Sequence, residues 1–150
     1  MHTIRPAQPD DAERVSQIAR LAYAPYVADI GREPPPMLQD FPADIAAGRC
    51  WVSGRPALGY VVAYPRKDDW MLENVAVAPE AQGTGLGRTL IVHAEDLARA
   101  AGAPAIVLYT HAKMTRNRVL YPALGYRQTK RETQHGLDRV FFQKDLQTLR

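Results

Sequence analysis

The stretch of sequence that decides the fold runs from residue 73 to residue 88 and is ENVAVAPEAQGTGLGR. Its first half alternates in the manner of a strand, and we expect that strand to cover residues 70–78. Its second half contains Gly83, Gly85 and Gly87 and opens a helix, because apolar residues recur every three or four positions from Leu86 to Ala101. A strand that enters a glycine-rich turn and then a helix suits phosphate binding, since free amides at a helix N-terminus attract anions.

Two common phosphate-binding motifs do not fit this turn. A P-loop needs a lysine after its last glycine, whereas Gly87 is followed by arginine and threonine. A dinucleotide fingerprint needs glycine at its sixth position, and counting from Gly83 or Gly85 that position holds Arg88 or Leu90. From these residues alone, the turn is either a pyrophosphate site or a tight connection between a strand and a helix.

The same periodicity analysis extends to the rest of the chain. Strands are expected over residues 3–5, 49–53, 58–64, 70–78, 105–109, 126–130 and 139–143, and helices over 10–24, 37–47, 86–101 and 115–124. The first helix has Asp10 as a candidate N-cap, with Glu13 completing a capping box. The fold class is therefore α/β (α+β), with about seven strands and four helices, and 150 residues suit one domain over residues 1–150.

Composition restricts the classes of protein to consider. Cys50 is the only cysteine in the sequence, and no apolar run approaches the roughly 18 residues of a membrane helix. We expect a cytoplasmic protein with no membrane partner, and with no metal, because no cluster has the spacing of metal ligands. The net charge is +3, but residues 111–150 hold nine basic and three acidic residues. That excess indicates a nucleic acid, an anionic cofactor or a solvated face. On the count alone, a high-GC coding bias toward arginine is the favoured interpretation.

Two blocks of the sequence resemble the GCN5-related N-acetyltransferase (GNAT) superfamily. Gln82-x-x-Gly85-x-Gly87 after a strand is similar to its acetyl-CoA signature, Gln/Arg-x-x-Gly-x-Gly/Ala. The second block consists of Asn117, Leu120-Tyr121 and Leu124-Gly125-Tyr126. The expected order of strands and helices also agrees with this family, whose fold has a mixed, mostly antiparallel twisted sheet flanked by four helices. The resemblance is specific in the second half of the chain and weak before Leu58.

The resemblance implies acetyl-CoA as co-substrate and assigns residues to it. The pantetheine arm would meet the backbone of Val75, Ala76 and Val77. The pyrophosphate would meet Gln82, Gly83, Thr84, Gly85, Leu86, Gly87 and Arg88. Asn117 would contact the pantetheine or line the thioester end. Tyr121 would lie near the sulfur, or else it is an ordinary core tyrosine. A homodimer is common in this family.

Acetyl transfer to an amine requires a base for the ammonium, whose pKa is roughly 10, and a proton donor for the departing thiolate. The resemblance makes Tyr121 the donor. Glu73, on the strand that faces the acceptor in the family, is either the base or a solvated strand residue. His111, just past the next strand, is a second candidate base because an imidazole titrates near neutral pH, but a loop histidine is favoured. His93 and Glu95 are expected on the solvent face of the long helix.

The function expected is therefore direct transfer of an acetyl group from acetyl-CoA, in a ternary complex, to a primary amine of a small molecule or peptide. Residues 23–44 are rich in aromatic and acidic side chains, and they either form a wall for a cationic amine or an ordinary helix pair. That region contains Tyr23, Tyr26, Asp29, Glu33, Met37, Asp40, Phe41 and Asp44. The alternatives are a non-catalytic acyl-CoA-binding sensor and a nucleic-acid binder. The latter is disfavoured because the C-terminal segment has few aromatic residues for stacking.

Overall fold

The computed structural model describes residues 2–146, which fold into two compact units. The first unit contains the chain up to Tyr64 together with Leu72–Ala94, and the second contains Pro65–Met71 together with the chain from Glu95. Strand β4 (Trp70–Val77) and helix α4 (Leu86–Ala100) each contribute residues to both units.

The first unit has the strand order β1 (Ile4–Pro6), β2 (Cys50–Ser53), β3 (Gly59–Pro65) and β4. The second unit has the order β4, β5 (Ala105–His111), β7 (Leu137–Asp145) and β6 (Arg127–Gln134). The pairs β1–β2, β2–β3, β5–β7 and β6–β7 are antiparallel, whereas the start of β4 pairs with β5 in parallel. The described residues form seven strands and five α-helices, of which four are longer than four residues, in agreement with the seven strands and four helices that the sequence predicts. The predicted mixed, mostly antiparallel fold is therefore confirmed.

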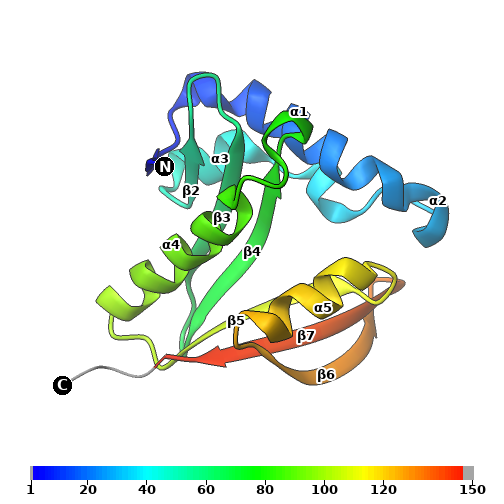
Figure 1. The fold of residues 1–150 in the computed structure, drawn as a ribbon. Helices are drawn as coiled ribbons and strands as arrows, with labels where there is room; N and C mark the ends of the chain where they lie inside the picture. Colours follow the sequence, from blue (N-terminus) through cyan, green and yellow to red (C-terminus); the bar gives the residue numbers. More distant parts are fainter. Residues whose placement is uncertain (1, 147–150) are drawn as a thin grey trace. The chain divides into compact units, whose positions relative to one another are not determined.

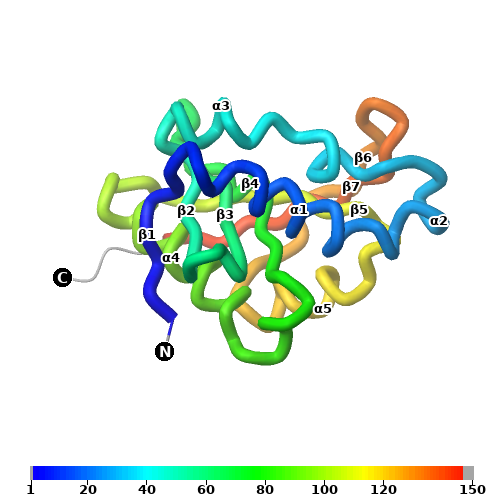
Figure 2. Tube along the Cα trace, turned by 90° about the horizontal axis from the view of Figure 1, so that it is seen from above, coloured from blue at the N-terminus to red at the C-terminus, as the bar shows by residue number. Residues whose placement is uncertain are grey.

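The first unit has helices on both faces of its strands. Its elements are β1 (Ile4–Pro6), α1 (Ala12–Tyr23), α2 (Val27–Ile30), α3 (Phe41–Ala46), β2 (Cys50–Ser53) and β3 (Gly59–Pro65). Tyr60 and Val62 of β3 pack in one core with α1 and α3. A Cβ at Gly59 would instead lie 3.0 Å from Leu86 and from Leu90 of α4. Because side chains alternate along a strand, the two faces of β3 pack against different helices. Figure 2 shows α3 and the turn into α4 on opposite sides of β2 and β3.

The entry into α1 differs from the predicted capping box. Asp11, rather than Asp10, is the buried carboxylate, and it accepts the backbone N–H of Gln8 at 2.8 Å. The guanidinium of Arg5 in β1 donates to both Asp11 carboxylate oxygens, at 2.8 and 2.9 Å. This two-pronged contact ties the first strand to the start of the first helix. The sequence pattern missed it because the cap lies in a 3-10 turn, Pro9–Asp11, ahead of the helix.

The predicted helix over residues 37–47 is interrupted. A 3-10 turn covers Pro35–Leu38, and α3 begins only at Phe41. Asp40 caps α3, because its Oδ1 accepts the N–H of Ala43 at 3.1 Å. The expectation that Phe41 helps to line an acceptor wall is wrong, since its ring is 1% exposed and packs edge-on against Tyr60 at 5.1 Å.

The second unit places a helix on an antiparallel sheet. Its elements are β5 (Ala105–His111), α5 (Thr115–Ala123), β6 (Arg127–Gln134) and β7 (Leu137–Asp145), as Figure 1 shows. Leu108 pairs with Phe142, and Tyr121 of α5 packs on the same Phe142 ring. Strand β6 lies at the edge of the sheet and is almost wholly exposed and polar. A charged edge of this kind opposes pairing with other strands.

Two residues predicted on the solvent face of the long helix are not there. Glu95 is 3% exposed, and it accepts hydrogen bonds from the Tyr126 hydroxyl at 2.9 Å and from Lys144 Nζ at 3.0 Å. His93 packs against Trp51, with ring centroids 5.7 Å apart. Both partners are distant in sequence, so helical periodicity alone cannot reveal them. Cys50 is buried as expected, and burial raises the pKa of its thiol to about 12. Over residues 2–146, no helix is long and apolar enough to cross a membrane.

The contact between Arg5 and Asp11 leads to a prediction about acid stability. The hydrogen bonds from Arg5 hold the pKa of Asp11 below its usual range, so this stabilisation is present above about pH 4 and is lost as the pH falls through the folded-state pKa. We expect Asp11→Asn to lower the free energy of unfolding by about 1–3 kcal/mol at pH 7, with a smaller difference from wild type at pH 3. Urea denaturation at both pH values measures this effect. Asp10→Asn, an exposed neighbour with the same change of charge, is the control and should shift the curve little. Equal loss in the two variants would contradict the assignment.

Candidate active site

The glycine-rich turn ends in a helix start with free amides. Gly83 and Gly85 have φ angles of +79° and +84°, in the left-handed region that favours glycine. A Cβ at either position would meet no atom within 4 Å. Thr89 N donates to Gly85 O at 3.1 Å, so the amides of residues 86–88 lie in the first turn, before any helical carbonyl can reach them. Together with the positive end of α4, they form a place for an anion.

Neighbouring groups hold this turn in place. The Thr84 hydroxyl donates to Ala81 O at 2.6 Å, and His2 Nε2 lies 3.1 Å from Thr84 O. A Cβ at Gly87 would lie 3.5 Å from Val77, so the first turn of α4 rests directly on the end of β4. The turn is therefore built before any ligand arrives, which reduces the conformational cost of binding.

The predicted cofactor residues of this unit differ in exposure. Gln82, Gly83, Thr84, Gly85 and Arg88 are exposed; Val75, Val77 and Gly87 are half-buried; Ala76 and Leu86 are buried. The side chains of the last two belong to the core, so a ligand can reach only their backbone. The Tyr23 hydroxyl donates to Val75 O at 3.2 Å, a contact at this strand that was not predicted from the sequence.

Glu73 is half-buried and held by two neutral donors. The Tyr64 hydroxyl donates to its Oε1 at 2.9 Å, and Gln39 Nε2 donates to its Oε2. The Arg49 guanidinium lies over the Tyr64 ring, 4.5 Å from its centroid. A carboxylate has about four acceptor positions, so these two donors leave capacity for a further proton or ligand.

The neighbouring residue, Asn74, belongs to the same group of polar contacts. It is 3% exposed, and its Oδ1 accepts a hydrogen bond from the Tyr60 hydroxyl at 2.7 Å. Its Nδ2 donates to Gln39 Oε1 at 2.6 Å. Burial raises the pKa of the Tyr60 hydroxyl well above its ordinary value, so Tyr60 stays a neutral donor. The sequence analysis did not identify this contact, and the signal that could have revealed it is a polar residue in phase with the small apolar residues Ala76 and Ala78.

Asn117 and Tyr121 lie in the second unit. Asn117 Nδ2 donates to Thr110 Oγ1 at 3.0 Å, which fixes the end of β5 to α5. Tyr121 is 5% exposed and packs edge-on against Tyr126 with centroids 5.6 Å apart. Burial raises the pKa of the Tyr121 hydroxyl, which is therefore protonated at neutral pH. Within residues 2–146 this hydroxyl makes no hydrogen bond.

His111 has the character of a structural residue. It is the last residue of β5, and burial lowers the pKa of its imidazole. Its Nδ1 accepts the N–H of Lys113 at 3.1 Å. This contact occupies one ring nitrogen in holding the turn between β5 and α5.

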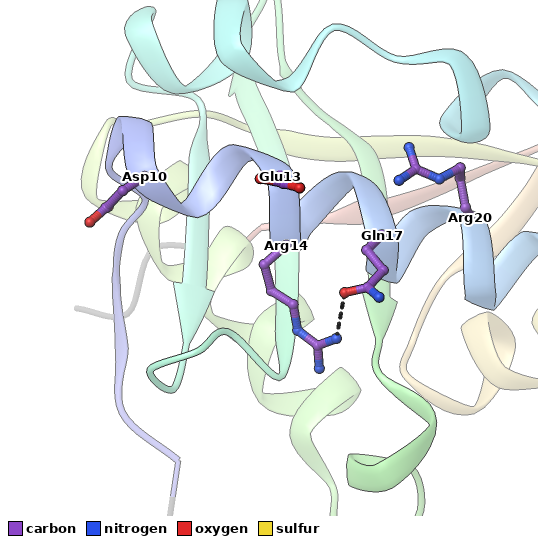
Figure 3. Close-up of a pocket in the computed structure, with 5 residues that line it drawn as sticks. All are labelled: Asp10, Glu13, Arg14, Gln17 and Arg20. Atoms are coloured by element: carbon purple, nitrogen blue, oxygen red, sulfur yellow. Dashed lines mark hydrogen bonds between the residues drawn. The ribbon is translucent and has the colours of Figure 1, made fainter.

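One surface hollow is lined by none of these residues. It has a volume of about 340 Å³ and lies along α1, where it is lined by Asp10, Glu13, Arg14, Gln17 and Arg20. Figure 3 shows these charged and polar side chains on α1 and, for Asp10, on the 3-10 turn before it, with Arg14 donating to Gln17 at 3.0 Å. None of the predicted site residues lines it. No group of three His, Cys, Asp or Glu side chains in the described part of the chain is placed to hold a metal ion.

Comparison with known proteins bears on the family of this chain. The sequence model of the acetyltransferase (GNAT) family matches residues 15–126. Mycothiol acetyltransferase from Arthrobacter sp. (strain FB24) is 36% identical over 83 residues, which is 55% of this chain and 22% of that protein. The mycothiol acetyltransferase of Beutenbergia cavernae is 38% identical over 63 residues, covering 42% of this chain and 21% of that protein. The chain thus matches about a fifth of the length of these curated relatives.

Solved structures share the fold at low sequence identity. PaiA N-acetyltransferase from Thermoplasma acidophilum, in complex with coenzyme A, has a TM-score of 0.79 and 19% identity, with 97% of this chain and 99% of that chain covered. YncA from Salmonella typhimurium, a putative acetyltransferase with its cofactor acetyl-CoA, has a TM-score of 0.71 and 23% identity, with 100% and 96% covered.

The buried pair of Tyr60 and Asn74 gives a prediction about stability. Asn74→Ala would leave the Tyr60 hydroxyl buried without its acceptor, so we expect the free energy of unfolding to fall by about 1–3 kcal/mol. The same substitution in a Tyr60→Phe background should cost less, because no hydroxyl then lacks a partner. Chemical denaturation of the four proteins of this double-mutant cycle measures the difference. Equal costs in both backgrounds would show that the hydrogen bond does not couple the two residues.

Proposed function

This chain belongs to the acetyltransferase (GNAT) family, and on that premise we propose that it transfers an acetyl group from acetyl-CoA directly to a primary amine of a small molecule or peptide. The observation that carries the proposal is the start of α4, with two left-handed glycines and free first-turn amides. The names of the curated relatives and the cofactors in the related structures point to the same class of reaction.

The turn fits the charge and shape of the co-substrate. A pyrophosphate is a dianion, and the amides of residues 86–88 and the dipole of α4 offer positive charge. Open space where Cβ atoms would stand at Gly83 and Gly85 lets phosphate oxygens approach the backbone. Arg88 is exposed on the first turn and adds a cation. The backbone of Val75, Ala76 and Val77 would bind the pantetheine arm, with Asn117 near the thioester.

The reaction removes two protons from the acceptor nitrogen, adds one proton to sulfur and exchanges a C–S bond for a C–N bond. Glu73 takes the first proton from the acceptor ammonium, which leaves a neutral amine as nucleophile, and passes that proton to solvent. The amine nitrogen attacks the thioester carbonyl, the new C–N bond forms, and the C–S bond breaks with its electron pair on sulfur, while the nitrogen loses its second proton to solvent and becomes a neutral amide. Tyr121 then gives its hydroxyl proton to the CoA thiolate and regains a proton from solvent. No covalent enzyme intermediate is required, because both substrates are bound together.

The cofactor site can be tested with a matched pair of glycine variants. Gly85 and Gly102 have φ angles of +84° and +77°, and both face open space, so a glutamate strains the backbone similarly at each. We expect Gly85→Glu to raise the Kd for acetyl-CoA by more than about tenfold, because its carboxylate enters the pyrophosphate space. Gly102→Glu, at the other end of the helix, should leave that Kd unchanged. Isothermal titration calorimetry with acetyl-CoA measures both. An equal Kd in the two variants would contradict the site.

The donor role of Tyr121 predicts a loss of rate rather than of affinity. Tyr121→Phe keeps the ring that packs on Tyr126 and Phe142, so we expect the fold to persist and kcat to fall by about 100-fold with the acetyl-CoA Kd unchanged. The measurement is thiol release across amines, amino acids, polyamines, aminoglycosides and peptides. Tyr109→Phe removes a hydroxyl from β5 and is the control. Unchanged kcat in Tyr121→Phe would remove the donor role, and binding without thiol release in the wild type would favour an acyl-CoA sensor.

A further inference from the structure

We infer that Gln39 is the positioning residue for Glu73, a role that rests on the function proposed above for that carboxylate. Gln39 lies between the 3-10 turn Pro35–Leu38 and α3, and no sequence motif marks it. Its side-chain amide reaches Glu73 and Asn74, two consecutive residues of β4, and it also reaches Asp44 of α3. One side chain therefore joins the helical segment before β2 to the strand that carries the proposed base.

The hydrogen-bond pattern fixes the orientation of this amide. Gln39 Nε2 has two N–H donors, and one goes to Glu73 Oε2 while the other goes to Asp44 Oδ2 at 2.7 Å. Gln39 Oε1 accepts from Asn74 Nδ2 at 2.6 Å. Reversing the amide would turn its oxygen toward two carboxylates and its N–H groups toward another donor. The observed orientation is the one in which both N–H hydrogens of the Gln39 amide have an acceptor.

The group of contacts continues into the buried core. Asn74 Oδ1 accepts a hydrogen bond from the Tyr60 hydroxyl. Tyr60 is 0% exposed, and its ring packs edge-on against Phe41. The chain from Tyr60 through Asn74 and Gln39 to Glu73 is therefore anchored at its inner end. Glu73 receives its second donor from Tyr64 at 2.9 Å. Both oxygens of the carboxylate are thus held from different elements, which restricts its rotation.

This chain of contacts orients the carboxylate rather than conducting protons. A proton relay needs groups that both accept and release a proton, such as a hydroxyl, a carboxyl or an imidazole. Two consecutive members, Asn74 and Gln39, are amides, which donate N–H bonds without exchanging protons readily. Proton removal from an acceptor amine then depends on where the Glu73 oxygens lie, because a base must be within hydrogen-bond reach of the proton it takes.

Gln39→Met tests the inference, since methionine keeps the length of the side chain and removes its amide. With spermidine, kanamycin, L-lysine and an alanyl pentapeptide as probes, we expect kcat for the best acceptor to fall by about tenfold or more, while the acetyl-CoA Kd stays within about twofold. Tyr64→Phe, which removes the other donor to Glu73, should also lower kcat. Gln17→Met, the same substitution on the exposed face of α1, should change neither value. Assays are run well below the melting temperature of every variant, so a loss of stability alone leaves kcat unchanged.

The outcomes separate this inference from the function on which it rests. A large fall in kcat for both Glu73→Gln and Gln39→Met, with unchanged acetyl-CoA binding, supports the positioning role. A fall for Glu73→Gln with wild-type kcat for Gln39→Met overturns the inference and leaves the proposed function intact. Wild-type kcat in Glu73→Gln overturns both the base and its positioning residue. Absence of thiol release by the wild-type protein with every probe overturns the proposed function and this inference with it.

Discussion

The close approach of α4 to the strands of the first unit is the constraint on which the proposed cofactor site depends. Gly59 has no side chain, and a Cβ there would lie only 3.0 Å from Leu86 and from Leu90. Leu86 is the first residue of α4, so its packing against Gly59 fixes where the helix begins relative to β3. Gly87, whose Cβ would lie 3.5 Å from Val77, brings the same turn against the end of β4. The amides of residues 86–88 consequently face outward from a helix end that cannot shift without disturbing buried leucines.

The two faces of β4 differ in burial because side chains alternate along a strand. Ala76 and Ala78 are small and face the core formed with α1 and α3, where they leave room for the rings of Tyr60 and Phe41. Val75 and Val77 alternate with them and are only half-buried. The polar pair Glu73 and Asn74 interrupts this apolar pattern, and the cost of burying it is offset because each side chain has hydrogen-bond partners. Strand β4 therefore combines a packed face with a polar position next to the backbone proposed for pantetheine.

The sequence predicted the elements well and the polar partners poorly. Periodicity located α4, the hairpin of β2 and β3, and the pair β6 and β7 to within a few residues, because each depends on local alternation or helical spacing. It failed for the helix expected over 37–47, because Asp40 caps a new helix that begins only at Phe41. It also failed for Glu95, because the partner Lys144 lies 49 residues away. Gln39 had no signal of its own, since its three side-chain partners come from two different elements and become neighbours only in the folded chain.

The basic excess of the C-terminal segment acquires a specific explanation from its contacts. Arg131 pairs with Asp138 at 2.7 Å, Lys130 with Glu132 at 3.0 Å, and Lys144 with Glu95 at 3.0 Å. These three cations of β6 and β7 therefore form ion pairs with carboxylates of the same chain. Two further contacts cover the aromatic rings of the sheet. Arg139 lies 4.2 Å from the centroid of Tyr109, and Lys130 lies 4.6 Å from that of Phe141.

These contacts weigh against a nucleic-acid surface on the second unit. Binding of single strands requires aromatic faces on which bases can stack, and here a cation from the same sheet already occupies a face of each ring. Two exposed cations that make none of these contacts are Arg116 on α5 and Arg88 on the first turn of α4. Each belongs to a helix that carries proposed cofactor residues, and a guanidinium in such a place suits a phosphate group.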